Sequence, residues 1–425
     1  MDASIVKLIK QKDTPYAHDK QGSGYLGKRI ESFEPDHIFV YEKIKHDDLV
    51  SSILANFPTA RVDVVPNQSP ATIRKLEPKL ECTQSTNKNA AIIDIAKKLL
   101  FIGTATRERF VEKFTNKLDC LCPQFYSLTP LNNGCYYSCA YCYLQVTYRG
   151  VFPYIKINVN LDDLKEAVLR VVQRESRVGN SALTFNCGEK LDSLSFDRWL
   201  GLSKILVPFF ANTSQLERST LLLLTKSDCV ENLIELASRN TKVTRNTVVS
   251  WSLNSEEFAI KYEIGSPPPS KRLGAARKCQ DAGYKVRLRI DPLLFLPNWH
   301  IYYERLVKDI FLKYELNPEI ITLGALRFET GLDSIAKARF KGIDLFDYDF
   351  IVEGHDKHRY KIEDRIILYK SLISMIEKYS SHAGLPRAHI GLCKEKRGAW
   401  LDSGLNLEDC HCNCIGHWQI NRRDK

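Results

Sequence analysis

Short apolar runs alternate with segments in which apolar residues recur at every third or fourth position through the middle of the chain. The runs predict strands, and Leu221–Thr225, which is almost wholly apolar, is typical of a strand covered on both faces of a parallel sheet. The intervening segments predict amphipathic helices, one of which opens at Asn160 with acidic residues in its first turn. The predicted strands span 181–185, 221–225, 247–253, 284–290 and 319–323, and the predicted helices begin at 160 and span 200–210, 230–238, 270–282 and 302–314.

Repeated strand–helix units imply a parallel sheet joined by right-handed crossovers. About six units fit between Leu131 and Leu326, which is fewer than the roughly eight of a complete barrel. We therefore expect an α/β fold built around a partial (β/α)6 TIM-like barrel. Its chemistry is expected at the carboxyl ends of the strands.

Two further regions flank the predicted barrel, which takes residues 121–328. Residues 1–120 are expected to form a mixed α/β region, and residues 329–425 a C-terminal region with a cysteine-rich tail. The N-terminal pattern predicts strands over 36–41, 60–65 and 98–102 and a helix over 47–56. Residues 66–89 are polar and contain Pro and Asn, so we expect a surface loop there.

The composition, with 44% apolar and 26% charged residues among 425, is typical of a soluble globular protein. No apolar run approaches the roughly 18 residues of a membrane helix, and the N-terminus lacks a secretory signal, so we expect a cytoplasmic protein with no membrane partner. The net charge of +10 favours an anionic partner such as nucleic acid, with a basic solvated surface as the alternative. Thirteen cysteines without a signal favour reduced thiols or metal ligands over disulfides.

One motif carries the candidate chemistry. Cys135, Cys139 and Cys142 stand at the spacing CxxxCxxC, and thiolates are the usual ligands of iron–sulfur clusters. Three ligands on a [4Fe-4S] cluster leave one iron open to a small chelating molecule, such as S-adenosylmethionine with its amino and carboxylate groups. The alternatives are a three-ligand zinc site and plain buried thiols, but zinc sites usually combine two paired sets of ligands.

The motif resembles that of the radical S-adenosylmethionine superfamily. The continuation Pro153–Leu161, together with Leu224–Ser227 and Arg289–Pro292, resembles the spore photoproduct lyase family in particular, over roughly residues 95–400. The resemblance implies a barrel of radical S-adenosylmethionine type that cleaves this cofactor to a 5′-deoxyadenosyl radical. It also implies a lyase of the carbon–carbon type that repairs a DNA pyrimidine photoproduct and receives electrons from a donor such as flavodoxin or ferredoxin.

The resemblance also implies roles for single residues. Tyr141 and Tyr143 match tyrosines of a hydrogen-atom relay, with packing around the cluster as the alternative. Cys187 is a candidate hydrogen-atom donor, although it is displaced by about two positions from the family's cysteine, and a buried thiol is the alternative. The candidate cofactor-binding residues are Glu189, Lys226, Ser252, Asn254 and Arg289, the last with an internal ion pair to Asp291 as the alternative.

The cysteine-rich tail departs from that family. Cys393, Cys410, Cys412 and Cys414 are candidate ligands of a second cluster or a zinc ion. A second hypothesis follows, in which a radical enzyme modifies a peptide or an RNA with an auxiliary metal in this tail. A third is a non-enzymatic nucleic-acid-binding protein with a structural metal.

Overall fold

The computed structural model describes residues 33–80, 86–114, 120–147, 153–354, 357–407 and 411–420. Its centre is an eight-stranded sheet in the order β18-β14-β13-β11-β10-β9-β5-β4, parallel except where β4 meets β5. The strands are β4 (Val111–Lys113), β5 (Tyr126–Leu128), β9 (Thr184–Cys187), β10 (Thr220–Thr225), β11 (Thr247–Leu253), β13 (Lys285–Leu293), β14 (Ile320–Ala325) and β18 (His389–Leu392). The predicted α/β class and the predicted central strands are confirmed.

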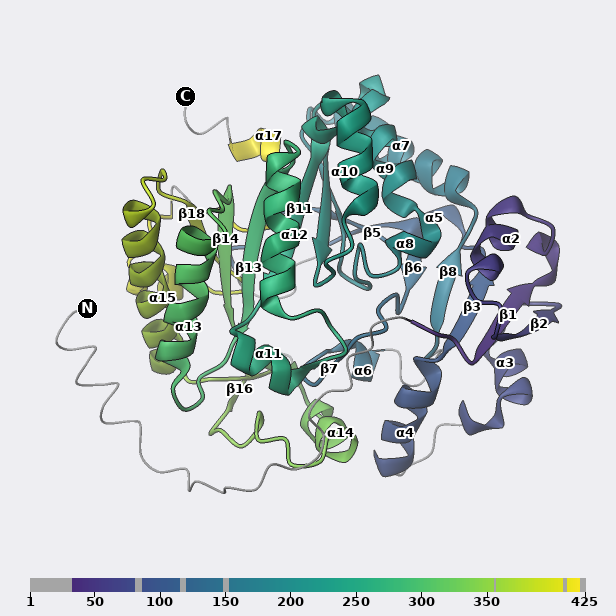
Figure 1. The fold of residues 1–425 in the computed structure, drawn as a ribbon, viewed down its shortest axis with the longest axis horizontal. Helices are drawn as coiled ribbons and strands as arrows, with labels where there is room; N and C mark the ends of the chain where they lie inside the picture. The colour runs from purple at the N-terminus through teal and green to yellow at the C-terminus, as the bar shows by residue number, and fades with distance from the viewer. Residues whose placement is uncertain are drawn as a thin grey trace.

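Helices follow the central strands and cover the sheet, with α10, α12 and α13 side by side along it in Figure 1. They are α7 (Leu161–Arg177), α8 (Asp197–Leu200), α9 (Leu202–Asn212), α10 (Glu231–Arg239), α11 (Glu256–Tyr262), α12 (Pro269–Asp281), α13 (Trp299–Lys308) and α15 (Ile362–His382). The predicted helix over 302–314 ends earlier as α-helix, because a π-helical turn over Asp309–Lys313 follows α13. No helix within the described ranges is long and apolar enough to cross a membrane.

A second sheet, in the order β2-β1-β3-β8-β6, lies at the right of Figure 1. Its strands are β1 (His37–Tyr41), β2 (Arg61–Val65), β3 (Leu99–Gly103), β6 (Leu131–Asn132) and β8 (Ile155–Asn158), and its helices are α2 (Asp48–Ala55), α3 (Pro70–Leu76), α4 (Thr86–Ala96) and α5 (Arg107–Phe110). Alternate residues of β3 face different cores, because Leu100 and Ile102 join the main core while Leu99 and Phe101 pack with α3 and α4.

The predicted surface loop over 66–89 is wrong, because α3 and the start of α4 occupy much of it. Ser69 caps α3, since its hydroxyl accepts a bond from Ala71 N at 3.3 Å, and Pro70 takes the first helical position. Ile73 is fully buried from this short helix. The cap at Ser69 and the burial of Ile73 therefore stabilise α3 although the segment is polar.

The C-terminal region returns to the central sheet. Strand β18 pairs with β14 in parallel, so this sheet takes strands from residues beyond 328. The remaining strands and α-helices of the described residues are β7 (Ser138–Cys139), α6 (Leu144–Thr147), β12 (Glu263–Ile264), β15 (Arg327–Glu329), α14 (Leu332–Arg339), β16 (Ile351–Glu353), β17 (Lys357–Arg359), α16 (Arg397–Asp402) and α17 (His417–Ile420).

The tail over 411–417 is fixed to three central strands by buried polar contacts. Arg287, fully buried on β13, donates to Asn413 O at 2.7 Å and to Ile415 O at 2.6 Å. Asn413 also receives a bond from Ser250 on β11 at 2.7 Å and donates its backbone N–H to Thr322 on β14 at 2.8 Å. We call this set of contacts the tail lock.

Glu319 supports the tail lock from its far side. Its carboxylate accepts a bond from Arg287 Nε at 2.7 Å and contacts the ring of His417. Burial would raise the pKa of Glu319, but Arg287 and then His417 outweigh burial and lower that pKa from 4.5 to about 2. The carboxylate therefore stabilises the fold fully above about pH 4.5, and this stabilisation is lost as the pH falls toward 2.

We expect Glu319→Gln to lower the free energy of unfolding by about 1–3 kcal/mol at pH 7, because Arg287 loses its charged partner. The variant should also lose less stability than wild type between about pH 4.5 and 2. Urea denaturation over this pH range measures both effects. Glu315→Gln is the control, since the Arg277–Glu315 pair is mostly exposed and should contribute about 1 kcal/mol or less. Equal acid dependence in wild type and Glu319→Gln would contradict the expectation.

Candidate active site

A cavity of about 390 Å³ lies at the carboxyl ends of the central strands. Gly188, Lys226 and Cys393 line it immediately after β9, β10 and β18, and Arg289 and Asp291 line it from the second half of β13. Parallel strands bring their carboxyl ends to one edge of the sheet, so residues distant in sequence meet here.

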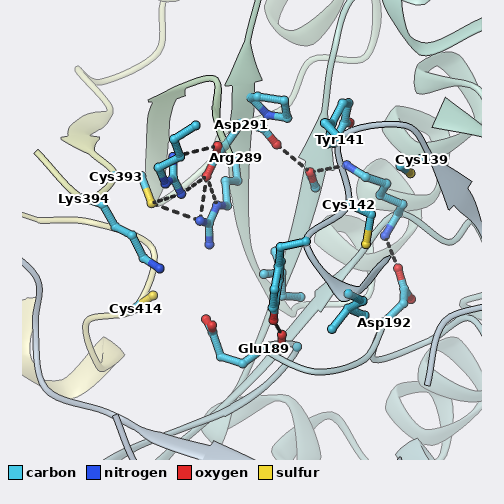
Figure 2. A pocket seen from close by; sticks show the side chains of 18 of the residues that line it. Cys139, Tyr141, Cys142, Glu189, Asp192, Arg289, Asp291, Cys393, Lys394 and Cys414 are labelled. Atoms are coloured by element: carbon cyan, nitrogen blue, oxygen red, sulfur yellow. Dashed lines mark hydrogen bonds and ion pairs between the residues drawn. The ribbon is translucent and has the colours of Figure 1, made fainter. Parts of the chain in front are cut away.

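Cys135, Cys139 and Cys142 all line this cavity. Figure 2 shows Cys139 and Cys142 together on one side of it. Backbone bonds shape the loop, since Cys142 N donates to Cys139 O at 3.1 Å and Cys135 N donates to Asn133 O at 2.8 Å. Strand β7 pairs antiparallel with β12, which sets Cys139 opposite Glu263. The structure thus brings together the three cysteines of the motif.

The three thiols fit the ligand set of an iron–sulfur cluster. Burial raises the pKa of Cys139 to about 12 and that of Cys135 well above its usual value, so each thiol must release its proton when it binds iron. Among the described residues, no group of three or more His, Cys, Asp and Glu side chains could hold a single metal ion. A cluster binds each thiolate at a different iron, so its ligands need not converge on one point.

Lys97, which follows α4, holds the cysteine loop from behind. Its ammonium donates to Cys135 O at 3.0 Å and to Tyr137 O. Arg339 lies close by and contacts Gln145, whose amide donates to Cys139 O at 3.1 Å and Ala140 O at 3.0 Å. Both cations therefore stand beside the three thiols without contacting the main cavity.

We expect Lys97→Met to loosen the loop and to shift the midpoint potential of a bound cluster to a more negative value. Removal of a positive charge near the thiolates disfavours the added electron. A redox titration followed by electron paramagnetic resonance measures the potential, and iron analysis measures retention. Lys98→Met is the control, since Lys98 forms an exposed ion pair with Asp36 at 3.4 Å and is itself 62% exposed. An unchanged potential with full iron content would rule out this role.

Lys226 follows β10, and its side chain reaches the neighbouring strand β11. Its ammonium donates to Ser252 Oγ at 2.6 Å and pairs with Glu263 at 3.3 Å. Its backbone N–H donates to the buried carboxylate of Asp192 at 2.6 Å, which fixes the residue in place. Lys226 and Ser252 both line the cavity, as expected of cofactor-binding residues.

Asn254 lies elsewhere. It is fully buried and does not belong to the cavity lining, because its amide donates to Pro292 O at 3.0 Å and its oxygen accepts from Tyr303 at 2.9 Å. The side chain therefore supports the wall behind the cavity.

Tyr141, Tyr143 and Glu189 line the cavity near the cysteine loop. The Tyr141 hydroxyl donates to the Glu263 carboxylate, and the Tyr143 hydroxyl donates to the backbone carbonyl of Glu189. The Glu189 carboxylate accepts a bond from Asn186 at 3.1 Å and faces the cavity in Figure 2. An acidic group and two phenols are thus available beside the three thiols.

Arg289 and Arg327 share one carboxylate. Arg289 donates to Asp291 at 2.6 and 3.0 Å, and Arg327 donates to it at 3.2 Å. Both guanidinium groups also contact Cys393 Sγ, at 3.0 and 3.2 Å. Burial would raise the pKa of Asp291, but Arg327 and Arg289 lower it well below its usual range. The internal Arg289–Asp291 pair named as the alternative is therefore present, and Arg289 still lines the cavity.

Cys187 does not line the cavity. It is the last residue of β9, is 1% exposed, and lies in register with Leu223 of β10. Burial raises its pKa to about 12. Its neighbours Gly188 and Glu189 reach the cavity, so the chain turns toward the site one residue after this thiol.

The sequence reasoning missed Asp192, which lines the cavity, and Glu263, which lies behind the lining and contacts residues of the site. Glu263 contacts Tyr141, Lys226 and Arg272, and these neighbours lower its pKa to about 2 although burial opposes the shift. It lies on a two-residue strand, which has no periodic signal. Asp192 follows the Gly188-Glu189 turn, and a lone acid in a loop is a weak signal.

The C-terminal cysteines reach the same cavity. Cys393, Cys412 and Cys414 line it, and so does Cys122, which was not considered as a site residue. Cys410 lies outside the described residues.

The sequence is similar to those of known spore photoproduct lyases. A family model described as spore photoproduct lyase matches residues 33–330. A spore photoproduct lyase of Clostridium acetobutylicum is 28% identical over 196 residues, which are 45% of this chain and 55% of that protein. One of Geobacillus is 30% identical over 196 residues, which are 46% and 54% of the two chains. The match thus spans about half the length of these two relatives. One of Bacillus subtilis is 24% identical over 278 residues, 65% and 73% of the two chains.

Solved structures share the fold. A spore photoproduct lyase complexed with dinucleoside spore photoproduct has a TM-score of 0.67 and 21% identity, covering 84% of this chain and 98% of its own. A mutant of such an enzyme with bound AdoMet, which is S-adenosylmethionine, and the same dinucleoside has a TM-score of 0.65 and 20% identity, with the same coverage.

Proposed function

Because the chain belongs to the spore photoproduct lyase family, we propose that it is a radical S-adenosylmethionine enzyme that repairs a pyrimidine photoproduct in DNA. The observation that carries the proposal is one cavity that is lined by three cysteines, Cys135, Cys139 and Cys142, and also by Lys226 and Glu189. Solved relatives of the same fold bind S-adenosylmethionine and a dinucleoside photoproduct, which supports both ligand classes.

A [4Fe-4S] cluster on the three cysteines would supply the electron that splits S-adenosylmethionine to the 5′-deoxyadenosyl radical. Lys226 suits the carboxylate of this cofactor, and Glu189 suits its ammonium group. Ser252 orients Lys226 through their 2.6 Å bond. Arg289 lines the cavity near Cys393, where its positive charge suits an anionic part of the substrate. Tyr141 and Tyr143 lie beside the cysteine loop as candidates for hydrogen-atom relay.

We also propose that the central sheet forms a partial barrel. The parallel strands β5, β9, β10, β11, β13 and β14 support a partial (β/α)6 barrel of radical S-adenosylmethionine type, with β18 added at the edge beside β14. The regions 1–120 and 329–425 flank this barrel. The lining residues support this arrangement, since they follow the carboxyl ends of successive strands.

Anaerobic protein supplied with iron and sulfide, a reductant and S-adenosylmethionine tests the proposal. We expect 5′-deoxyadenosine and a restored pyrimidine pair with ultraviolet-irradiated DNA, and neither with unirradiated DNA. Reduced flavodoxin or ferredoxin should replace the chemical reductant. Formation of 5′-deoxyadenosine only with RNA or a peptide would contradict DNA repair and favour substrate modification.

A further inference from the structure

The tail over 411–417 lies directly beneath the cavity, on the same face of the central sheet. Ser250 and Arg287 hold the tail, whereas Ser252 and Arg289, two residues further along the same strands, line the cavity. Residues two apart on a strand point to the same face. The tail lock and the cavity therefore lie on the same face of the sheet, two residues apart along β11 and β13.

The close approach of the tail is built into the sheet. A Cβ atom at Gly391 of β18 would lie 2.1 Å from His411 O and 2.8 Å from Cys412 Cα. Only glycine leaves room for the tail backbone at this position. The ring of His411 also stacks on His389 of β18, with centroids 4.5 Å apart. The position of the two tail cysteines is thus determined by both main-chain and side-chain contacts.

Cys412 and Cys414 present thiols to the cavity from this tail. Figure 2 shows Cys414 and Cys393 on the side opposite Cys139 and Cys142, with Glu189 between the two groups. The Cys414 thiol is also hydrogen-bonded to Cys412.

Two other thiols are less suited to react with a substrate radical. Cys187 is outside the cavity lining, and Cys393 Sγ is contacted by two guanidinium groups. The tail lies beyond residue 330, where the match to the family model ends.

We propose that Cys414 donates a hydrogen atom to the substrate radical, with Cys412 as its supporting thiol. This inference rests on the proposed function. In the step, the S–H bond of Cys414 breaks, a C–H bond forms on the substrate, and the unpaired electron moves to sulfur. The hydrogen moves as an atom from Cys414 to the substrate, so no separate electron or proton is released. The adjacent Cys412 thiol can exchange its hydrogen with the sulfur radical of Cys414.

Repair in D₂O by wild type, Cys414→Ala, Cys414→Ser and Cys187→Ala tests the assignment, because thiol hydrogens exchange with solvent. Wild type should place one deuterium in the repaired product. The two Cys414 variants should still form 5′-deoxyadenosine, but repaired product per 5′-deoxyadenosine should fall at least about tenfold. Cys187→Ala should behave like wild type. Iron content and melting temperature establish that each variant is folded and loaded.

Three results would overturn the assignment. Full repair with deuterium transfer by both Cys414 variants would remove Cys414 from the reaction. Loss of transfer in Cys187→Ala alone would assign the step to that thiol. Iron beyond about four atoms per chain, lost in Cys414→Ala, would make the tail cysteine a metal ligand instead. No 5′-deoxyadenosine from loaded wild type with irradiated DNA would instead reject the proposed function, and this inference with it.

Discussion

Cys139→Ala is expected to abolish cluster binding and the cleavage of S-adenosylmethionine. Cys139 is one of the three motif cysteines, all of which line the cavity. It lies on β7, which pairs with β12 so that Cys139 is opposite Glu263. Mutation of a residue that only hydrogen-bonds to a metal ligand typically lowers metal affinity by about 10- to 100-fold. Loss of a ligand itself should therefore lower the affinity for the cluster by at least about 100-fold. Iron and sulfide analysis after anaerobic reconstitution, followed by a 5′-deoxyadenosine assay, measures both effects.

Cys279→Ala is the matched control for Cys139→Ala. Cys279 is also fully buried, but it lies in α12 and away from the cavity. This variant should retain its iron and its activity, with only the modest loss of stability of a small core truncation. Equal iron content in Cys139→Ala and Cys279→Ala would contradict the assignment of the cluster to this motif.

Asp291→Ala is expected to lower the free energy of unfolding by about 3–5 kcal/mol, because two buried guanidinium groups lose their shared counter-charge. The Asp291 side chain is 9% exposed and pairs with Arg289 and Arg327 at 2.6 and 3.2 Å. The fold makes room for this carboxylate, since a Cβ at Gly324 would lie 2.6–2.9 Å from its atoms. Urea denaturation at pH 7 measures the effect.

Asp281→Ala provides the comparison for Asp291→Ala. Asp281 pairs with Arg277 at 2.8 Å on the exposed side of α12, with its side chain 56% exposed. Such surface pairs contribute about 0.2–1 kcal/mol. If both variants lost the same small amount of stability, Asp291 would not be the buried counter-charge that the geometry indicates.

The central sheet was predictable because its strands are buried on both faces. Runs such as Leu221–Thr225 have no polar alternation, so they were distinguished from helices by their length and their spacing between amphipathic segments. Helix α3 within the region 66–89 was not predicted, because it depends on a cap at Ser69 and on one buried residue, Ile73. The tail lock joins segments more than 90 residues apart, and local patterns do not encode such pairings.

The site was predictable only where chemistry is local in sequence. The spacing of Cys135, Cys139 and Cys142 identified the motif, and the placement of Lys226 after a buried strand put it at the mouth of the sheet. Local patterns did not show that Cys187 lies outside the cavity lining, because one residue of register separates a buried strand end from the cavity. Glu263 was missed, because its importance comes from neighbours in three other segments.

Electron paramagnetic resonance of the reduced protein, with and without S-adenosylmethionine, tests the central claim most directly. The account predicts the spectrum of a reduced [4Fe-4S] cluster, with a signal that changes when the cofactor occupies the iron left without a thiolate. A protein that takes up no iron, or a cluster signal that S-adenosylmethionine leaves unchanged, would contradict it.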